Sequence, residues 1–295
     1  MGSMKALNTL LDRETGLGVL TNAFRVIYDG NLDFPPPPFE RPYIAFNFAK
    51  SLDGVISFMI PGKEGGGEIS GFNSSDQFVM AMLRSVFGNV MVGANAIRKQ
   101  PDHLWTPEFL FPDNVQLFSR QRLKFGQSGK QRTFVVTGSG QIKPEHKHDL
   151  PPPPEIPAAF QDENTEAWII TTEIGRSQVV ADYPFLEERI KVFGDNEKVD
   201  LKSTLLFLRQ ELQIKYLLVE GEARFAGSLI EEGLFDEFFL STASQIVGSS
   251  TKNPRLSFVE GALFTPETAP WFKLISLKLD HSNGDMVLAR YRRYK

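Results

Sequence analysis

Residues 215–240 constrain the fold more than any other stretch of this chain, because a strand, a glycine turn, a helix and a second strand follow one another within them. The run from Tyr216 to Val219 is short and continuously apolar, which is typical of a strand covered on both faces. Beyond it the apolar spacing becomes that of one helix face, at Phe225, Ala226, Leu229 and Ile230. Gly233 can end this helix in a left-handed conformation. The pattern predicts an α/β unit with a strand-to-helix turn after Glu220.

The predicted turn has the features of an anion-binding turn and consists of Gly221, Glu222, Ala223 and Arg224. Amide groups at a helix start point outward with a partial positive charge, and a residue without a side chain lets an anion approach them. This geometry suits a pyrophosphate. The alternative is that the glycine only permits the sharp bend that such a turn requires.

Composition narrows the class of protein. The formal net charge of −4 gives no field that attracts polyanions, so nucleic acid is not an expected partner. The chain has no cysteine, which excludes disulfides, thiolate metal sites and a cysteine nucleophile. No stretch approaches the ~20 apolar residues of a membrane span, and the first residues lack the apolar core of a secretory signal. We therefore expect a cytoplasmic globular protein with a small-molecule ligand.

Three segments, in the same order along the chain, resemble a known enzyme family. Val219 begins the string VEGEARFAGSLIEEGLFDEFFL, which resembles VEGGxxLxGxLLxxGLxDEL of the pyrimidine reductases of riboflavin biosynthesis. Asn47 begins NFAKSLDG, which resembles the family's opening strand and SLDG turn, and Asn89 begins NVMVGANAI, which resembles its VGAGTV strand, turn and helix. The family is the reductase half of a bifunctional deaminase/reductase. We expect no deaminase half in this chain, because its zinc motif needs cysteine and the sequence contains none.

The resemblance implies a dihydrofolate reductase-like α/β fold: a mostly parallel central sheet, helices on both faces and a C-terminal antiparallel hairpin that turns at Asn283-Gly284. It covers residues 41–295, with insertions near 102–131 and 141–165. Residues 1–40 are predicted to be an extension: a helix around residues 7–17, an edge segment at 24–28 and a stiff spacer at Pro35–Pro38. Relatives of this fold usually pair, so a homodimer is implied.

The first core strand is predicted at residues 43–49, and it ends in a polar turn at 51–54. Open α/β sheets bind ligands beyond the carboxyl ends of their strands, although a plain tight turn is the alternative. By resemblance, the substrate contacts come from Asn47, Ser51, Ser70 and Arg84, and the catalytic candidates are Asp53 and Glu220. Arg84 is assigned to the substrate's phosphate, which suits a two-pronged donor; an unpaired surface arginine is the alternative.

Two local patterns lie between these positions. The stretch PGKEGGG at residues 61–67 is too glycine-rich for one conformation, so we expect a mobile loop over the site entrance with no helix directly after it. Ser74–Asp76 then offers a helix cap, and the helix has an apolar face formed by Phe78, Val79, Met82, Leu83 and Val86.

A second strand-to-helix turn is predicted after residues 90–92, with a helix starting near Ala96. By resemblance, this turn contacts the nicotinamide dinucleotide through Val92, Gly93, Ala94 and Asn95. Thr137 and Ser139 then approach the adenosine end, where hydroxyl groups hold a 2′-phosphate, so NADPH is the expected cofactor rather than NADH. The chain departs from the family here, because Ala96 replaces a threonine and Lys99-Gln100 replaces an acidic pair.

Glu222 is the largest departure from the family pattern, because it stands where a second glycine is usual. Its carboxylate repels a pyrophosphate unless it points away or pairs with Arg224. Three hypotheses follow: an NADPH-dependent reductase that transfers hydride to the ribose carbon of a ribosylaminopyrimidine phosphate, a same-fold reductase of a pterin, dihydrofolate-like or other carbonyl or imine substrate, and a non-catalytic ligand-binding member.

A metal site is not predicted. His146 and His148, with Glu145 and Asp149, are ligand types that metals use, but nothing in this polar, proline-rich segment holds them rigid.

Overall fold

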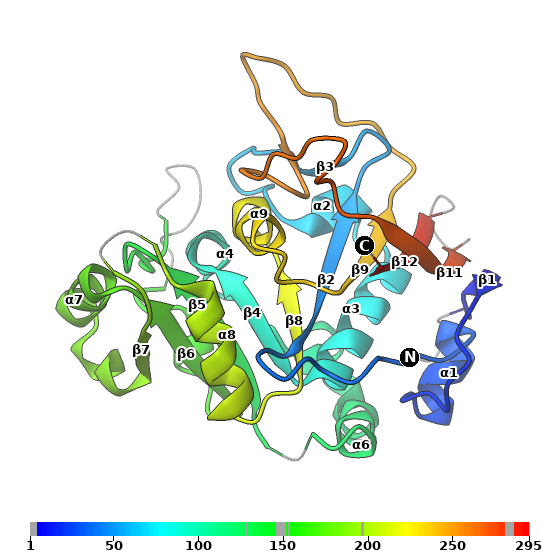
Figure 1. Cartoon of the computed structure of the whole chain (residues 1–295), viewed down its shortest axis with the longest axis horizontal. Helices are drawn as coiled ribbons and strands as arrows, with labels where there is room; N and C mark the ends of the chain where they lie inside the picture. Colours follow the sequence, from blue (N-terminus) through cyan, green and yellow to red (C-terminus); the bar gives the residue numbers. More distant parts are fainter. Residues whose placement is uncertain are drawn as a thin grey trace.

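A ten-stranded sheet forms the centre of the computed structural model, which describes residues 5–127, 129–145, 152, 154–195, 198–280 and 286–294 (Figure 1). The strand order is β1-β11-β12-β9-β2-β8-β4-β5-β6-β7. From β9 to β7 in this order all neighbours are parallel, whereas β12, β11 and β1 are added antiparallel. The predicted fold class is confirmed, including the antiparallel pair near the C-terminus.

The elements have the following bounds. The strands are β1 (Asn8–Asp12), β2 (Tyr43–Lys50), β3 (Val55–Ser57), β4 (Asn89–Gly93), β5 (Gln131–Thr137), β6 (Thr165–Thr171), β7 (Ile190–Val192), β8 (Tyr216–Glu220), β9 (Glu237–Thr242), β10 (Leu256–Ser257), β11 (Phe272–Asp280) and β12 (Met286–Arg293). The α-helices are α1 (Asn22–Tyr28), α2 (Gly66–Ser70), α3 (Ser74–Phe87), α4 (Ala94–Lys99), α5 (Pro107–Leu110), α6 (Val115–Lys124), α7 (Glu173–Asp182), α8 (Leu201–Gln210) and α9 (Ala223–Glu231). Short 3-10 helices are η1 (Pro112–Asn114), η2 (Ala158–Phe160) and η3 (Pro184–Arg189).

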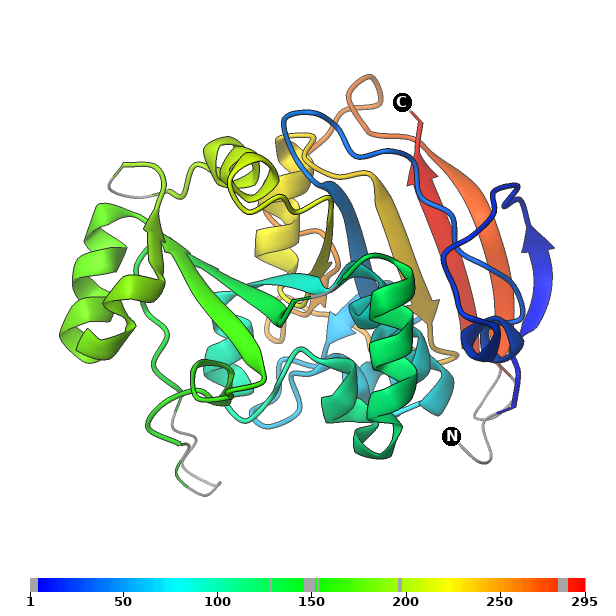
Figure 2. The same ribbon diagram turned by 90° about the horizontal axis from the view of Figure 1, so that it is seen from below.

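Helices cover both faces of the sheet, so the central strands are apolar on both sides. Figure 2 shows α8 and α9 on one face and α3 and α6 on the other. The side chains of β4 alternate accordingly: Val90 and Val92 join the core under α3, and Met91 joins the core under α9. A strand buried on both faces reads as a continuous apolar run, which is the pattern that predicted β4 and β8.

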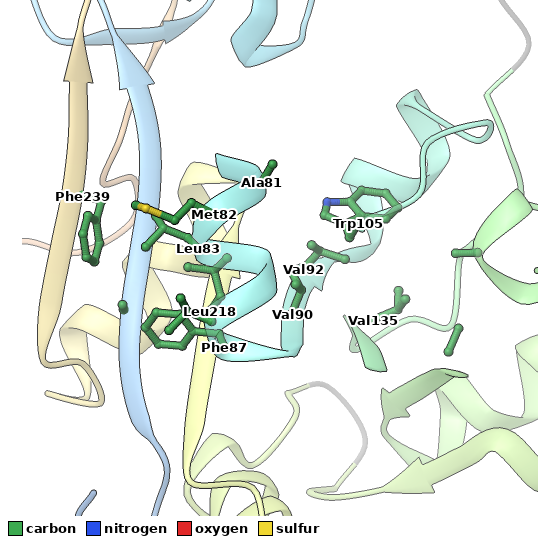
Figure 3. Close-up of a cluster of buried hydrophobic side chains, with 14 of the residues drawn as sticks. Ala81, Met82, Leu83, Phe87, Val90, Val92, Trp105, Val135, Leu218 and Phe239 are labelled. Atoms are coloured by element: carbon green, nitrogen blue, oxygen red, sulfur yellow. The ribbon is translucent and has the colours of Figure 1, made fainter. Parts of the chain in front are cut away.

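The core between α3 and the sheet is the larger hydrophobic cluster (Figure 3). It joins residues from α1, α3, eight strands and the segment after α4; Figure 3 labels Ala81, Met82, Leu83, Phe87, Val90, Val92, Trp105, Val135, Leu218 and Phe239. Phe87 is fully buried, and burying such a side chain stabilises the fold by about 1.5–3 kcal/mol. This packing fixes α3 against the strands that carry the site.

The prediction for the N-terminal segment was wrong in order, because the strand comes first and the helix second. In β1, Leu10 points outward and Leu11 inward, which is the two-residue period of an edge strand, and β1 pairs with β11. In α1, Phe24 and Tyr28 are four residues apart and both buried on one helix face. The ring of Phe24 lies 5.6 Å from that of Phe78 in α3. The N-terminal segment is therefore anchored to the core through buried side chains such as Leu20, Phe24 and Tyr28.

The proline run is also held by the domain. The carbonyl of Pro35 accepts a hydrogen bond from the Tyr216 hydroxyl at 3.4 Å, and the carbonyl of Pro38 accepts one from Arg209 Nε at 3.3 Å. Proline offers no amide hydrogen, so its carbonyl is the only main-chain group available for such bonds.

Two local predictions before α3 need correction. The glycine-rich stretch does form a helix, because α2 begins at Gly66, and Gly62 N donates to Glu64 Oε2 at 2.8 Å to close the preceding turn. The cap of α3 is Asn73, whose side-chain oxygen accepts from the amides of Ser75 and Asp76. Asparagine is one of the preferred residues at this position.

The predicted C-terminal antiparallel pair is present, with β11 and β12 paired from Phe272↔Arg293 to Asp280↔Met286. The predicted turn at Asn283-Gly284 lies outside the described residues. Among the helices that the structure describes, none has the length and apolar character needed to cross a bilayer.

Candidate functional site

Three adjacent parallel strands, β2, β8 and β4, bring the predicted site residues to one edge of the sheet (Figure 1). Asn47 in β2 lies directly beside Glu220, the last residue of β8. Gly93 is the last residue of β4, and α4 follows it at once. Since all three strands point the same way, their carboxyl ends open toward the same space, which is where α/β sheets bind ligands.

The two predicted anion-binding turns lie in contact. Gly221 has a φ of 67° and packs so close to α4 that an added Cβ would lie 3.5 Å from the Cβ of Ala96. In Figure 1, α4 and α9 are neighbours above the ends of β4 and β8. One ligand can therefore touch both turns.

Glu222 fills the space between these turns. Its Oε1 accepts a hydrogen bond from Asn95 Nδ2 at 2.5 Å, and its other oxygen lies against Gly93, where any added Cβ would collide with it. Among the described residues it does not pair with Arg224, whose side chain is exposed. Its backbone has a φ of 39°, in the left-handed region that a glycine adopts more easily. Of the two ways predicted to avoid repulsion, pairing with Arg224 is not used, and the carboxylate points into the turn.

Asn95 links this carboxylate to a basic residue. Arg98 Nη1 donates to Asn95 Oδ1 at 3.0 Å, and Arg98 Nη2 lies 3.0 Å from Glu145 Oε1. The amide of Glu145 also donates to the Arg98 carbonyl at 2.9 Å. A relay of alternating donors and acceptors thus runs from Glu222 to the segment that carries Glu145.

Arg84 is neither on the surface nor directed at an open phosphate position. It is 1% exposed, and its Nη2 lies 2.6 Å from Glu220 Oε2 while its Nε bonds to both oxygens of the same carboxylate. Its Nη1 donates to the carbonyls of Leu104 and Thr106, and Nη2 also meets His103 Nε2 at 3.2 Å. A guanidinium has five N–H groups, and these contacts use its full fork. Both the phosphate role and the surface alternative therefore give way to a buried ion pair that holds Glu220.

Asp76 is a functional candidate that the sequence pattern did not single out. It is 4% exposed, bonds to Ser70 and Ser241, and lies near Glu220. Burial raises the pKa of Asp76 above its usual value, and the nearby negative charge of Glu220 adds to the effect, while the two serine hydroxyl groups oppose it. Ser70, predicted to contact substrate, has its hydroxyl within this cluster. Its neighbour Ser241 comes from β9, a strand too distant in sequence to be linked by spacing.

His103 was also missed, because it lies in a stretch with no lasting period. Its ring packs 4.9 Å from that of Trp105 and 4.5 Å from that of Phe109, and its Nε2 faces Arg84. Burial, with the positive charge of Arg84, holds the pKa of His103 well below its usual value, so the imidazole is neutral.

Ser51 and Asp53 are engaged in holding a turn and a loop. Ser51 is fully buried, and its hydroxyl donates to Asp53 Oδ1 at 2.5 Å. The carboxylate of Asp53 also accepts from the amides of Val247 and Gly248, at 3.2 and 2.7 Å. The hydroxyl of Ser51 and then the amide of Gly248 lower the pKa of Asp53 to about 2. This side chain is ionised at neutral pH and cannot serve as an acid, so the geometry supports the plain-turn alternative.

The remaining predicted cofactor residues lie along the neighbouring strand ends. Val92 and Ala94 are buried, so they offer main-chain groups only. Thr137 ends β5, and its hydroxyl accepts from the amide of Gly140 at 3.1 Å, while Ser139 is exposed. A hydroxyl donor is therefore accessible beyond β5.

A cavity of about 370 Å³ lies at the amino ends of the parallel strands, where β2 and β9 begin. Its lining includes Arg41, Tyr43, Arg292 and Tyr294 and none of the predicted site residues. As for metals, no group of three or more His, Asp or Glu side chains in the described ranges is placed to hold an ion; His146, His148 and Asp149 lie outside those ranges.

A mostly parallel sheet with two touching strand-to-helix turns at its carboxyl edge defines a dihydrofolate reductase-like α/β protein. The sequence model described as the RibD C-terminal domain matches residues 42–278, and the chain belongs to that family.

Individual relatives agree with this assignment. The riboflavin biosynthesis protein RibD of Aquifex aeolicus is 26% identical over 213 residues, which are 71% of this chain and 48% of the relative, so the chain spans about half the length of that protein. A pyrimidine reductase-like protein of Corynebacterium diphtheriae superimposes with a TM-score of 0.62 at 17% identity, over 93% of this chain and 100% of that one. The deaminase/5-amino-6-(5-phosphoribosylamino)uracil reductase of Thermotoga maritima gives 0.54 at 19%, over 86% and 57%. At these identities, the structural likeness speaks for the fold alone.

Proposed function

We propose that this protein is an NADPH-dependent reductase of a ribosylaminopyrimidine phosphate, of the 5-amino-6-(5-phosphoribosylamino)uracil reductase type. The observation that carries the proposal is the contact between the turns at Gly93 and Gly221, beside the neighbouring pair Asn47 and Glu220. A long dinucleotide needs two such turns within reach of one another, and a substrate ring needs polar groups beside them. Homodimer formation belongs to the same proposal.

The residues present fit a dinucleotide except at one point. Gly93, Gly221 and the main chain of Ala94 would hold the cofactor's phosphates, and Ser139 would donate to a 2′-phosphate. The carboxylate of Glu222, which lies on Gly93, does not fit and must turn away first. When bound, the cofactor supplies the hydride that reduces the ribose carbon.

The chain's own groups would orient the substrate. Asn47 and Glu220 offer an amide and a carboxylate to the donors and acceptors of a pyrimidine edge. Arg84 holds the Glu220 carboxylate in place from behind, so no rotation is needed when the substrate arrives. The buried carboxyl group of Asp76, whose pKa is raised by burial, would lie near this pair. Asp53 has no catalytic role in this proposal, because its carboxylate accepts from the amides of Val247 and Gly248.

A second candidate, a non-catalytic ligand-binding member of the family, is favoured by the position of Glu222. The test that separates the two candidates follows the absorbance of reduced nicotinamide during incubation of the purified protein with NADPH and the ribosylaminopyrimidine phosphate. Turnover with NADPH, slower with NADH and slower with dihydrofolate as substrate, is the expected result. Lack of turnover with every pair, in protein whose binding to NADPH is measurable, would favour the non-catalytic candidate.

A further inference from the structure

The backbone at Glu222 is held in a conformation that a residue with a side chain rarely adopts. Its φ of 39° and ψ of 101° place it in the left-handed half of the map, directly after Gly221 at φ 67°. Such strain persists only where surrounding contacts over-determine it, and it is concentrated at functional sites. At Glu222 the determining contacts are those of its own carboxylate with Asn95 and Gly93.

The charge of this carboxylate is not balanced by a cation in contact with it. Its partner among the described residues is the neutral amide of Asn95, and the nearest cation along the relay is Arg98, which is already paired with Glu145 at 3.0 Å. A negative charge therefore stands at the junction of both turns, where the phosphates of a dinucleotide would lie under the proposed function. Two negative charges a few ångströms apart repel each other strongly in a partly buried site.

Gly93 is what makes this arrangement possible. Any side chain there would collide with the carboxylate, and the same open backbone would otherwise admit an anionic ligand. The carboxylate thus occupies, as part of the chain, the position that an external anion would take.

We propose that Glu222 is a specificity-determining residue of the two-turn site: its carboxylate acts as a built-in anion that a pyrophosphate-containing ligand must displace. The inference rests on the proposed function for the identity of the ligand. Displacement breaks the contact with Asn95 and with it the relay through Arg98 to Glu145. The protein therefore binds NADPH more weakly than it would with an uncharged residue at position 222.

The experiment compares four forms of the whole protein: wild type, Glu222→Gln, Glu222→Gly and the control Glu232→Gln. The control removes the same charge from an exposed position at the end of α9, on the side away from the turns. NADPH dissociation constants come from fluorescence titration at low and high salt, and inorganic pyrophosphate is titrated separately by thermal shift. Glycine suits a positive φ, so Glu222→Gly is expected to fold.

We expect the NADPH dissociation constant of both Glu222 variants to be at least ten-fold lower than that of the wild type. The control variant should have the wild-type constant. The difference from wild type should narrow at high salt, because salt screens the repulsion. Equal NADPH and pyrophosphate constants in wild type and both variants would overturn the inference while leaving the proposed function standing. If NADPH binds to none of the four forms but pyrophosphate gains affinity in the Glu222 variants, the inference stands and the proposed function fails.

Discussion

Two buried arginine–glutamate pairs lie at opposite ends of two parallel strands, β8 and β9, which flank β2 in the sheet. Glu220 ends β8 and pairs with Arg84 from α3, whereas Glu237 begins β9 and pairs with Arg290 from β12. The first pair lies beside the two turns of the candidate site. The second lies at the other edge, where Arg290 also contacts Glu14 and donates to the carbonyl of Asp33 at 2.7 Å.

The difference between the pairs is in what each arginine holds. The remaining N–H groups of Arg84 contact residues 103–106, so Arg84 also positions the segment that lies beside Glu220. The remaining N–H groups of Arg290 contact Glu14 and Asp33, so Arg290 holds the N-terminal segment against the sheet. Burial raises the pKa of Glu237 above its usual value, and the positive charge of Arg292 opposes this shift. A buried ion pair adds little net stability, yet removing one partner is costly. The same kind of pair positions Glu220 at the candidate site and holds the N-terminal segment at the other end of the strands.

The largest effect is expected for Arg290→Met. It leaves the carboxylates of Glu14 and Glu237 buried without their cation, which should lower the free energy of unfolding by about 3–5 kcal/mol. Urea denaturation measures this. As a matched control, Arg176→Met breaks an ion pair with Glu187 whose side chains are 45% and 52% exposed, and it should change stability by less than about 1 kcal/mol. A similar loss in both variants would mean that burial does not decide the strength of these pairs.

Arg84→Met should cost less stability, about 2–3 kcal/mol, because it leaves one buried carboxylate, that of Glu220, without its cation, whereas Arg290→Met leaves two. Its distinguishing effect is on function: kcat/KM per folded molecule should fall at least ten-fold, whereas Arg290→Met leaves that ratio unchanged. Arg84→Lys keeps the positive charge but loses the two-pronged guanidinium. Relative to Arg84→Met, it should restore more of the stability than of the activity. Equal kcat/KM values for Arg84→Met and Arg290→Met would contradict the different roles assigned to the two pairs.

The smallest effect is expected for Asp53→Asn, in a turn that neither pair touches. The carboxylate holds residues 247 and 248, so its loss should speed protease cleavage within 248–253 at neutral pH without moving the unfolding midpoint. Because the folded pKa of about 2 lies below the ordinary 3.8, the hold is present above pH 3.8 and is lost as the pH falls toward 2. Exposed Asp113, changed to asparagine, is the control. Unchanged cleavage in Asp53→Asn would show that the loop is held by other contacts.

Most of the central fold could be predicted from the sequence. Strands β4 and β8 are continuous apolar runs, and α9 follows with a clean helical period, so local pattern and burial agree. The N-terminal segment was assigned in the wrong order because β1 gains its stability from pairing with β11, a contact more than 250 residues away in sequence that no local pattern records. Short elements of this kind depend on tertiary packing rather than on propensity.

The site could be located but not resolved in detail. The turns at Gly93 and Gly221 were predicted from strand ends and glycines, and the structure brings them together. The partner of Arg84 lies 136 residues away, so periodicity could show that Arg84 leaves the apolar stripe but not what it meets. Asp76 was interpreted as part of a helix cap, and only the serine from β9 beside it reveals a buried acidic cluster.

The packing of α1 and β1 extends the folded unit beyond residues 42–278, the region that the family model matches. A version trimmed to residues 42–278 would lose the ring of Phe24 that packs on Phe78 and Phe118. It would also lose β12, through which β11 is joined to the rest of the sheet. The ends of a shortened form of this protein should therefore be chosen from the packing contacts of its terminal strands and helices, not from the bounds of the family match.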